Sequence, residues 1–362
     1  MNKNKLTLLI DGNWLLMSRM SVLVKKFDKT NPNPVKQEAS NEFETLLAKS
    51  LNVIINQFRD IDNIILMADG GSWRKKLLIP QCLQNTTYKG NRTQAIELDW
   101  DYIYKPFNKF FKKCESLGIT CCRYEDCEGD DWAWYWSRRL NDDGINCIIW
   151  TSDNDIKQLI QYNSDSRAFT AWYNSKNGLY LPASINQDYT DSIEFFMRPQ
   201  FLYNNILENL RHKQSNTHYE DPNKIILDKI FNGDAGDNIK PVVKYSKNNR
   251  LYKLTKKEYN AVLNHFNINT IDDLKKSYKE ISQYISNLKN IKPHHIDSSD
   301  IYDMLLYNTK LVWLHEETIP ETIVAAMNQF EYKYYDVDYI RSNYTILLDD
   351  NEDVMNIFES IK

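Results

Sequence analysis

Several features that would assign a chain to a specialised class are missing from this sequence. It contains no CxxC pair, and its six cysteines lack the spacing of a zinc site. No apolar run approaches the ~20 residues of a membrane span. The apolar run at 6–10 is also shorter than the roughly 7–15 residues of a signal-peptide core. We therefore expect a soluble cytoplasmic protein with reduced thiols and no membrane partner.

A large excess of charge is missing too. The 45 Lys and Arg residues nearly balance the 49 Asp and Glu residues, which gives a net charge of -4 and a pI near 5.9. This average disfavours nucleic-acid binding through overall charge, so the distribution of charge matters more. Hydrophobic residues make up 42% of the 362 residues, enough for one large domain and a smaller one.

Short apolar runs alternate with amphipathic stretches over the first half of the chain. The predicted strands are 6–10, 64–68 and 147–150, and the predicted helices are 12–24, 41–58 and one beginning near 130. Residues 167–182 predict a hairpin around NSKNG. The alternation predicts an α/β fold with a mostly parallel central sheet flanked by helices. From about 190 the pattern is mainly helical, which places a domain boundary within 185–220.

Each of the three predicted buried strands runs into an acidic residue. LTLLI leads to Asp11, IILMA leads to Asp69, and CIIW leads through Thr151 and Ser152 to Asp153 and then Asp155. Ligands of parallel α/β sheets bind at the carboxyl ends of the strands. We therefore expect these acids, although distant in sequence, to lie together.

Two further acidic segments extend this set to nine carboxylates. EGDD contributes Glu128, Asp130 and Asp131, and NGDAGDN contributes Asp234 and Asp237. Any one of them fits a helix cap or a turn, but nine clustered carboxylates repel one another unless cations are bound. Oxygen ligands suit Mg²⁺, with Mn²⁺ as a substitute. A site that holds two such ions can hydrolyse a phosphodiester.

Six segments follow one another in the order found in a known family. They are LLIDGNWLLMSR, MADGGSWRKKLL, TYKGNR, CEGDDWAWYW, WTSDNDIKQLI and FNGDAGDNIKPV. Together they resemble the flap endonucleases and 5′-3′ exonucleases, nearest to the ribonuclease H type of T-even phages, over about 11–240. YNTKLVWLHEETIPETI at 307–323 adds a weaker likeness. The resemblance implies a PIN-like catalytic domain at 1–215 with a helical arch at about 72–115, and a helical DNA-binding domain at 216–362.

The resemblance also implies roles for individual residues. The positions matching ligands of a first Mg²⁺ are Asp11, Asp69, Glu128, Asp130 and Asp153, and those near a second are Asp131, Asp155, Asp234 and Asp237. Lys89 and Arg92 match contacts to the scissile phosphate. The implied substrates are 5′ flaps, nicks and primers in DNA or RNA–DNA hybrids, cut by a monomer during replication or repair in a bacterial cytoplasm, including that of a phage-infected host. A single-strand-binding protein or a sliding clamp would be a partner.

Positive charge is concentrated in two acid-free stretches, 70–96 and 238–257. Such stretches suit phosphate binding, although each could also be a solvated face. The predicted nucleic-acid contacts are Arg74, Lys75, Lys89, Arg92, Lys240, Lys244, Lys247 and Arg250. The second stretch reads NIKPVVKYSKNNR where many relatives have a G-I-G turn, which departs from the usual potassium-binding hairpin.

Two other functions remain open from the sequence. A PIN-like ribonuclease for single-stranded RNA shares the acids at strand ends but needs neither the EGDD and GDAGDN acids nor the arch. A non-catalytic nucleic-acid-binding protein would use the acids only structurally. Trp14 fits either core packing or capping of a terminal base pair, whereas the aromatic residues at 132–136 predict core.

Overall fold

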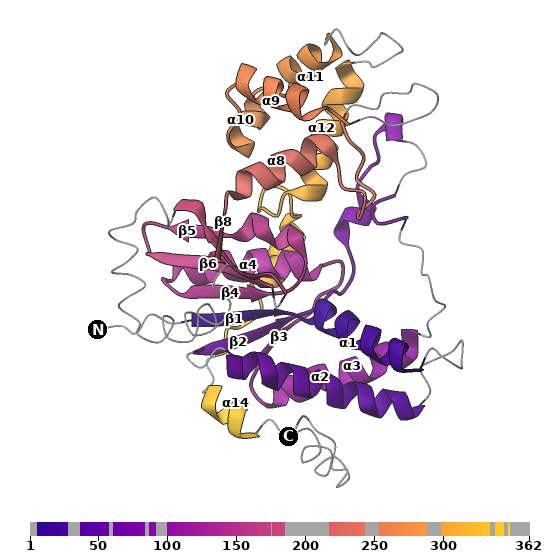
Figure 1. The fold of residues 1–362 in the computed structure, drawn as a ribbon, viewed down its shortest axis with the longest axis vertical. Coiled ribbons are helices and arrows are strands. Elements are labelled where there is room, and N and C mark those ends of the chain that lie inside the picture. The colour runs from indigo at the N-terminus through magenta and orange to yellow at the C-terminus, as the bar shows by residue number, and fades with distance from the viewer. Residues whose placement is uncertain are drawn as a thin grey trace.

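The computed structural model describes residues 6–27, 37–57, 61–83, 87–91, 100–174, 176–184, 217–242, 253–287, 298–333, 337–343 and 347. Within these ranges a central sheet carries helices on both faces, and a separate group of helices lies beyond one edge (Figure 1). No helix in the described part of the chain has the length and apolarity needed to cross a bilayer.

The sheet has eight strands in a mixed, mostly parallel arrangement. The strands are β1 (Leu6–Asp11), β2 (Asn63–Met67), β3 (Thr120–Cys122), β4 (Asn146–Trp150), β5 (Gln161–Asn163), β6 (Ala168–Asn174), β7 (Gly178–Pro182) and β8 (Thr217–Glu220). Their order is β3-β2-β1-β4-β6-β7-β8, with β5 paired to β6. Among the strands that the structure describes, only the β5–β6 and β6–β7 pairs are antiparallel. β1 lies between β2 and β4, parallel to both.

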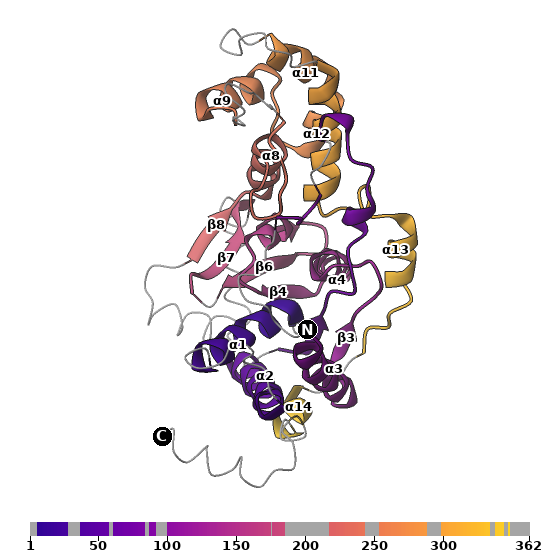
Figure 2. The same ribbon diagram turned by 90° about the vertical axis from the view of Figure 1, so that its right-hand side faces the viewer.

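Alternating side chains of β1 divide the core into two layers. Leu8 and Ile10 pack with the helices of one face, and Leu9 packs with the helices of the other. The first face is covered by α1 (Gly12–Phe27), α2 (Gln37–Gln57) and α3 (Trp100–Ser116). The second is covered by α4 (Gly129–Asp142) and α13 (Glu321–Met327), which lie side by side (Figure 2). Burial on both faces explains the apolar strands.

A third apolar cluster joins the helices beyond the sheet. These helices are α8 (Pro222–Asn232), α9 (Lys256–His265), α10 (Ile271–Lys276), α11 (Tyr278–Ser286) and α12 (Ser298–Val312). Leu83 and Tyr88, from the segment between β2 and α3, join the same cluster. The chain then returns to the sheet, where α13 contacts α4 and α14 (Val337–Asn343) contacts α2.

The α/β fold class predicted from the sequence is confirmed, as are the predicted strands and the hairpin of β6 and β7. Three short strands, β3, β5 and β8, were not predicted because three or four residues give too little periodicity. β8 pairs with β7, so the sheet continues past the boundary expected at 215. Most of the expected boundary region, 185–216, lies outside the described residues.

Candidate metal and phosphate site

The acids that follow β1 and β2 lie at one edge of the sheet. Asp11 is the last residue of β1 and is level with Met67, the last residue of β2. Asn13 joins the two strand ends, since its Nδ2 donates to Asp69 Oδ2 at 2.7 Å. The backbone N–H of Asp69 donates in return to Asn13 Oδ1 at 3.0 Å. Asn13 therefore holds the Asp69 carboxylate beside Asp11.

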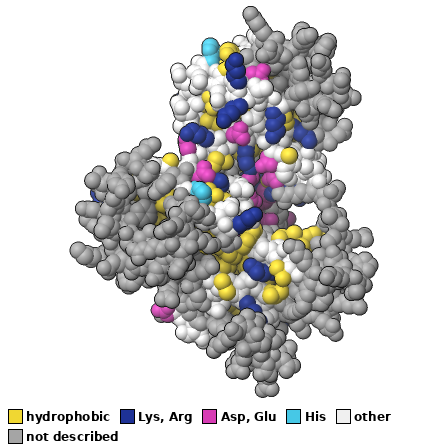
Figure 3. Space-filling model, viewed as in Figure 1, with side chains coloured by type: hydrophobic (Ala, Val, Ile, Leu, Met, Phe, Trp, Pro, Cys, Tyr) yellow, Lys and Arg dark blue, Asp and Glu magenta, His cyan; other side chains and the backbone are white. Residues whose placement is uncertain are grey.

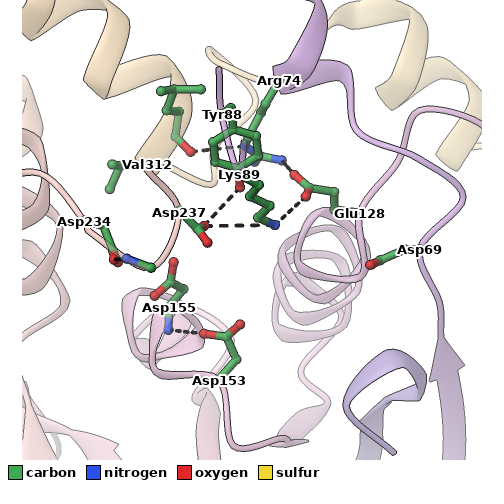
Figure 4. A network of polar contacts seen from close by, with 12 residues as sticks. Asp69, Arg74, Tyr88, Lys89, Glu128, Asp153, Asp155, Asp234, Asp237 and Val312 are labelled. Carbon is green, nitrogen blue, oxygen red and sulfur yellow. Dashed lines mark hydrogen bonds and ion pairs between the residues drawn. The ribbon is translucent and has the colours of Figure 1, made fainter. Parts of the chain in front are cut away.

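The segment after β4 is attached to the same edge through a hydroxyl group. Thr151 Oγ1 donates to Asp11 Oδ2 at 2.7 Å, and the backbone N–H of Asp153 donates to Thr151 Oγ1 at 3.1 Å. The N–H of Asp155 then donates to Asp153 Oδ1 at 2.9 Å (Figure 4). Asp11, Asp153 and Asp155 therefore belong to one hydrogen-bonded chain.

The first turn of α4 brings more acids to this edge. The backbone N–H of Gly129 donates to Asp69 Oδ1 at 2.6 Å, which places a helix N-terminus against that carboxylate. A β-carbon on Gly129 would lie 3.2 Å from Asp69 Oδ1 and 3.9 Å from Asp11 Oδ1. The glycine thus allows the helix to approach both acids closely. Asp130 follows it directly.

The electrostatics of these carboxylates are unfavourable without a cation. Burial, with repulsion from Asp69 and Asp153, raises the pKa of Asp11 to about 7. Burial and Asp153 likewise raise the pKa of Asp155 to about 6. The pKa of Asp130 is raised well above its usual value by burial and by Asp153. Within the described part of the chain, neither Asp11 nor Asp130 forms an ion pair with Lys or Arg.

A tight loop after α8 presents the last two acids. Asp234 and Ile239 exchange backbone hydrogen bonds of 2.9 and 2.8 Å, which closes the loop between them. The loop requires glycine at 233, where φ is +69° and a β-carbon would lie 2.4 Å from the Ile239 carbonyl oxygen. Asp234 and Asp237 thus face Asp155 across the site (Figure 4).

Arg74 occupies a position that the sequence did not predict. Its side chain is 2% exposed, and its Nη1 and Nη2 bond Glu128 Oε2 and Asp131 Oδ1 at 2.7 and 2.8 Å. The other Asp131 oxygen accepts from Trp73 Nε1 and from the Glu128 backbone N–H. These contacts bear on two predicted roles. Arg74 is buried against protein carboxylates instead of lying on the surface where it could contact a DNA phosphate, and both oxygens of Asp131 already accept hydrogen bonds from the protein.

Lys89 lies within the acidic site. Its Nζ is 2.6 Å from Glu128 Oε1 and 4.0 Å from Asp237 Oδ2 (Figure 4). The segment 87–91 is attached to the loop of Asp237 by the Lys89 N–H, by Asn91 and by Asn238, each with a bond of 2.8 Å. Lys89 itself has a left-handed φ of 57°, so its placement depends on these bonds.

Lys229 is a further cation of the site that the sequence did not predict. Its Nζ forms ion pairs with Asp155 Oδ1 and, at 2.7 Å, with Asp234 Oδ2. Burial raises the pKa of Asp234, but the neighbouring Lys229 outweighs it and the net shift is downward. A basic residue five positions before Asp234 was the only available signal in the sequence.

The donor set fits hard divalent cations. It consists of carboxylate oxygens, and four of the acids at the strand ends and on α4 have a raised pKa, caused first by burial. As the described side chains lie, however, no three of them from His, Cys, Asp or Glu converge closely enough to hold one ion. Arg74, Lys89 and Lys229 instead compensate part of the negative charge.

Some of the remaining predicted residues lie within the described ranges, and others lie outside them. Figure 3 shows acidic side chains near the centre of one face, with Lys and Arg side chains on the helices above them. Lys75 is exposed, and Lys240 is partly buried with its Nζ on Asn238 Oδ1 at 2.6 Å. Trp14 is partly buried and packs edge-on against Trp150, with 4.3 Å between the ring centroids. Arg92, Lys244, Lys247 and Arg250 lie outside the described residues.

Comparison with known proteins gives matches at the level of structure. No protein-family model and no curated protein sequence matches the chain. Among solved structures it is similar to a metal-bound bacteriophage T5 protein, at 14% identity, with a TM-score of 0.52 and coverage of 95% of this chain and 100% of that one. The chain has the fold of the phage T5 5′-nuclease. The zinc-bound T5 5′-exonuclease gives a TM-score of 0.53 at 14% identity over 95% and 100% of the two chains.

A third structure with this fold includes DNA. It is a variant of the bacteriophage T5 flap endonuclease in a pseudo-enzyme–product complex with DNA and metal ions. The TM-score is 0.51 at 16% identity, with 96% of this chain and 100% of that one covered. These T5 proteins therefore combine the fold with divalent metal ions and, in one case, with DNA. At this identity the likeness extends to the fold alone.

Proposed function

We propose that this protein is a metal-dependent, structure-specific 5′ nuclease that hydrolyses phosphodiesters of DNA and RNA–DNA hybrids. The observation that carries the proposal is that Asp11, Asp69, Asp130 and Asp153 lie at one edge of the sheet, at strand ends and at the start of α4. Thr151 links Asp11 to Asp153 by hydrogen bonds, and burial raises the pKa values of Asp11, Asp69 and Asp130, which supports a region of excess negative charge. The phage T5 5′-nuclease fold supports the same function.

The carboxylates divide into two groups that would hold two Mg²⁺ ions, with Mn²⁺ as a substitute. Asp11, Asp69, Asp130 and Asp153 would serve the first ion, and Asp155, Asp234 and Asp237 the second. Such ions, when bound, activate water and stabilise the leaving oxygen of a phosphodiester. Glu128, also predicted for the first ion, holds the Lys89 ammonium at 2.6 Å.

The protein's own cations would act on the substrate. Lys89 would neutralise charge developing on the scissile phosphate, because its ammonium already lies among the metal-binding carboxylates. Arg92 would act beside it. Lys75 and Lys240 would bind phosphates of the duplex, together with Lys244, Lys247 and Arg250 of the same basic stretch. The products would carry a 5′-phosphate and a 3′-hydroxyl, as in flap trimming or primer removal.

Cleavage of defined substrates tests the proposal. A 5′-labelled flap duplex, an RNA primer on DNA and a single-stranded RNA are incubated with Mg²⁺ or with EDTA. We expect Mg²⁺-dependent cutting of the flap and the primer, and its loss in Asp153→Asn. Asp165→Asn, the same change in the exposed turn between β5 and β6, should cut normally. Cutting of the RNA alone would favour a single-strand ribonuclease, and retention without cutting a binding protein.

A further inference from the structure

The second group of carboxylates already contains a cation from the protein. Lys229, in the last turn of α8, forms ion pairs with Asp155 and with Asp234. These two acids come from different parts of the fold, one from the segment after β4 and one from the loop after α8. The Lys229 side chain is only 17% exposed, so solvent screens these interactions weakly. A partly buried ammonium thus bridges two of the acids assigned to the second ion.

The surrounding structure fixes the backbone on both sides of this bridge. The N–H of Gly233 bonds the Lys229 carbonyl at 2.9 Å and ends the helix. Asn308 of α12 donates to the carbonyl oxygens of Ile230 and Lys240 at 2.8 Å each, which ties the end of α8 to the end of the loop. The backbone that carries Lys229 and Asp234 is therefore held in place, so separating their charges requires movement of side chains.

The charge of Lys229 is maintained by its partners. Burial lowers the pKa of its ammonium, but the carboxylates of Asp155 and Asp234 outweigh burial, and the net pKa is raised. The first group of acids differs in this respect. Among the described residues, no Lys or Arg forms an ion pair with Asp11, Asp130 or Asp153. The two halves of the site thus differ in direct pairing: Lys229 bridges Asp155 and Asp234, whereas Lys89 pairs with Glu128 and acts on Asp69 and Asp130 only from a distance.

We propose that Lys229 is a built-in counter-cation at the second ion position, so that without substrate the protein binds one divalent ion tightly and a second only by displacing the lysine ammonium. This inference rests on the proposed function and goes beyond it by stating which of the two positions binds its ion more tightly. Lys229 neutralises one of the two negative charges of Asp155 and Asp234, which weakens their attraction for a divalent ion. The lysine thereby sets the metal concentration at which the second position fills.

Metal binding by the full-length protein without nucleic acid tests the inference. Mn²⁺ is titrated into the wild type, Lys229→Met and Lys224→Met, with free Mn²⁺ followed by electron paramagnetic resonance. Lys224 is the matched control, because it lies on the same helix, its side chain is 82% exposed and it pairs only locally with Asp221. We expect one tight and one weak ion in the wild type and in Lys224→Met. In Lys229→Met the second ion should bind at least about tenfold more tightly.

Each outcome has a defined meaning. Unchanged affinity for the second ion in Lys229→Met would overturn the inference while leaving the proposed function in place. Absence of Mn²⁺ binding in both the wild type and Lys229→Met would overturn the proposed function itself. If Lys229→Met fails to fold by circular dichroism, Lys229→Gln replaces it, since an amide still donates hydrogen bonds to both acids but carries no charge. The same tightening is then expected, and its absence counts against the inference.

Discussion

Asn13 and Asp69 are joined by two reciprocal hydrogen bonds, one from the amide to the carboxylate and one from the Asp69 backbone to the amide oxygen. This pair connects the start of α1 to the end of β2. Asp69 also accepts the N–H of Gly129, so the pair lies between the strand ends and α4. The orientation of Asp69 toward Asp11 therefore depends on a neutral side chain that binds no metal in our proposal.

Asn13→Ala should reduce both stability and turnover. The change removes both bonds and leaves Asp69 with fewer donors, so we expect a loss of about 1–3 kcal/mol in the free energy of unfolding. Turnover with Mg²⁺ should fall because the carboxylate is no longer held beside Asp11. Urea unfolding and flap cleavage measure the two effects. Asn264→Ala on the exposed surface of α9 is the control; equal behaviour of the two variants would contradict the assigned role.

Arg74→Met should strongly destabilise the protein. The change leaves the buried carboxylate of Asp131 without its cation and leaves Glu128 with Lys89 alone. Breaking such a buried pair typically costs about 3–5 kcal/mol. Chemical denaturation measures the loss. The neighbouring Lys75 is exposed, so Lys75→Met should change stability by no more than about 0.5 kcal/mol while weakening DNA binding at low salt. If Arg74→Met instead weakened DNA binding with little loss of stability, Arg74 would be a phosphate contact.

Stability of the metal-free protein should fall as pH rises. The folded pKa of Asp11 is about 7 and that of Asp155 about 6, both above the ordinary value of 3.8. Each group therefore binds its proton more tightly when folded, and the fold loses stability from about pH 4 up to these raised values. Thermal unfolding in EDTA at pH 5 and pH 8 measures this trend. Asp130→Asn should raise the melting temperature above that of the wild type, more at pH 8 than at pH 5. A variant that melts below the wild type at pH 8 would contradict the repulsion.

Lys89→Ala should affect turnover more than binding. Lys89 lies among the acids and is held by the loop that contains Asp237, so its loss removes charge at the reacting phosphate and not along the duplex. Single-turnover rates and the Kd for a flap duplex separate the two effects. Asn238→Ala, which frees the carbonyl of Thr87, should give a smaller loss in the same direction. A drop in affinity for the flap duplex with an unchanged single-turnover rate would show that Lys89 only binds phosphate.

The sheet and the strand-end acids were predictable because their signals are local. A buried strand is visible as a short apolar run, and the acid after it is the next or a nearby residue, as at Asp11 and Asp69. Parallel pairing then brings these ends together regardless of their separation in sequence. The mostly parallel sheet followed from the same pattern.

The charge pairing within the site was not predictable in the same way. Arg74 lies in a basic run and looks like a surface residue, yet its partners Glu128 and Asp131 are 54 and 57 positions away in sequence. Lys229 and Thr151 likewise acquire their roles from Asp155 and Asp11, which only the folded chain brings near them. Local sequence patterns contain no information about such partners.

Diffraction from a crystal of this protein soaked in Mn²⁺ tests the central claim most directly, because anomalous scattering locates the ion without assumptions about activity. We predict a peak among Asp11, Asp130 and Asp153, at the carboxyl ends of β1 and β4 and the start of α4. A peak elsewhere on the molecule, or none at this edge of the sheet at saturating Mn²⁺, would contradict the account.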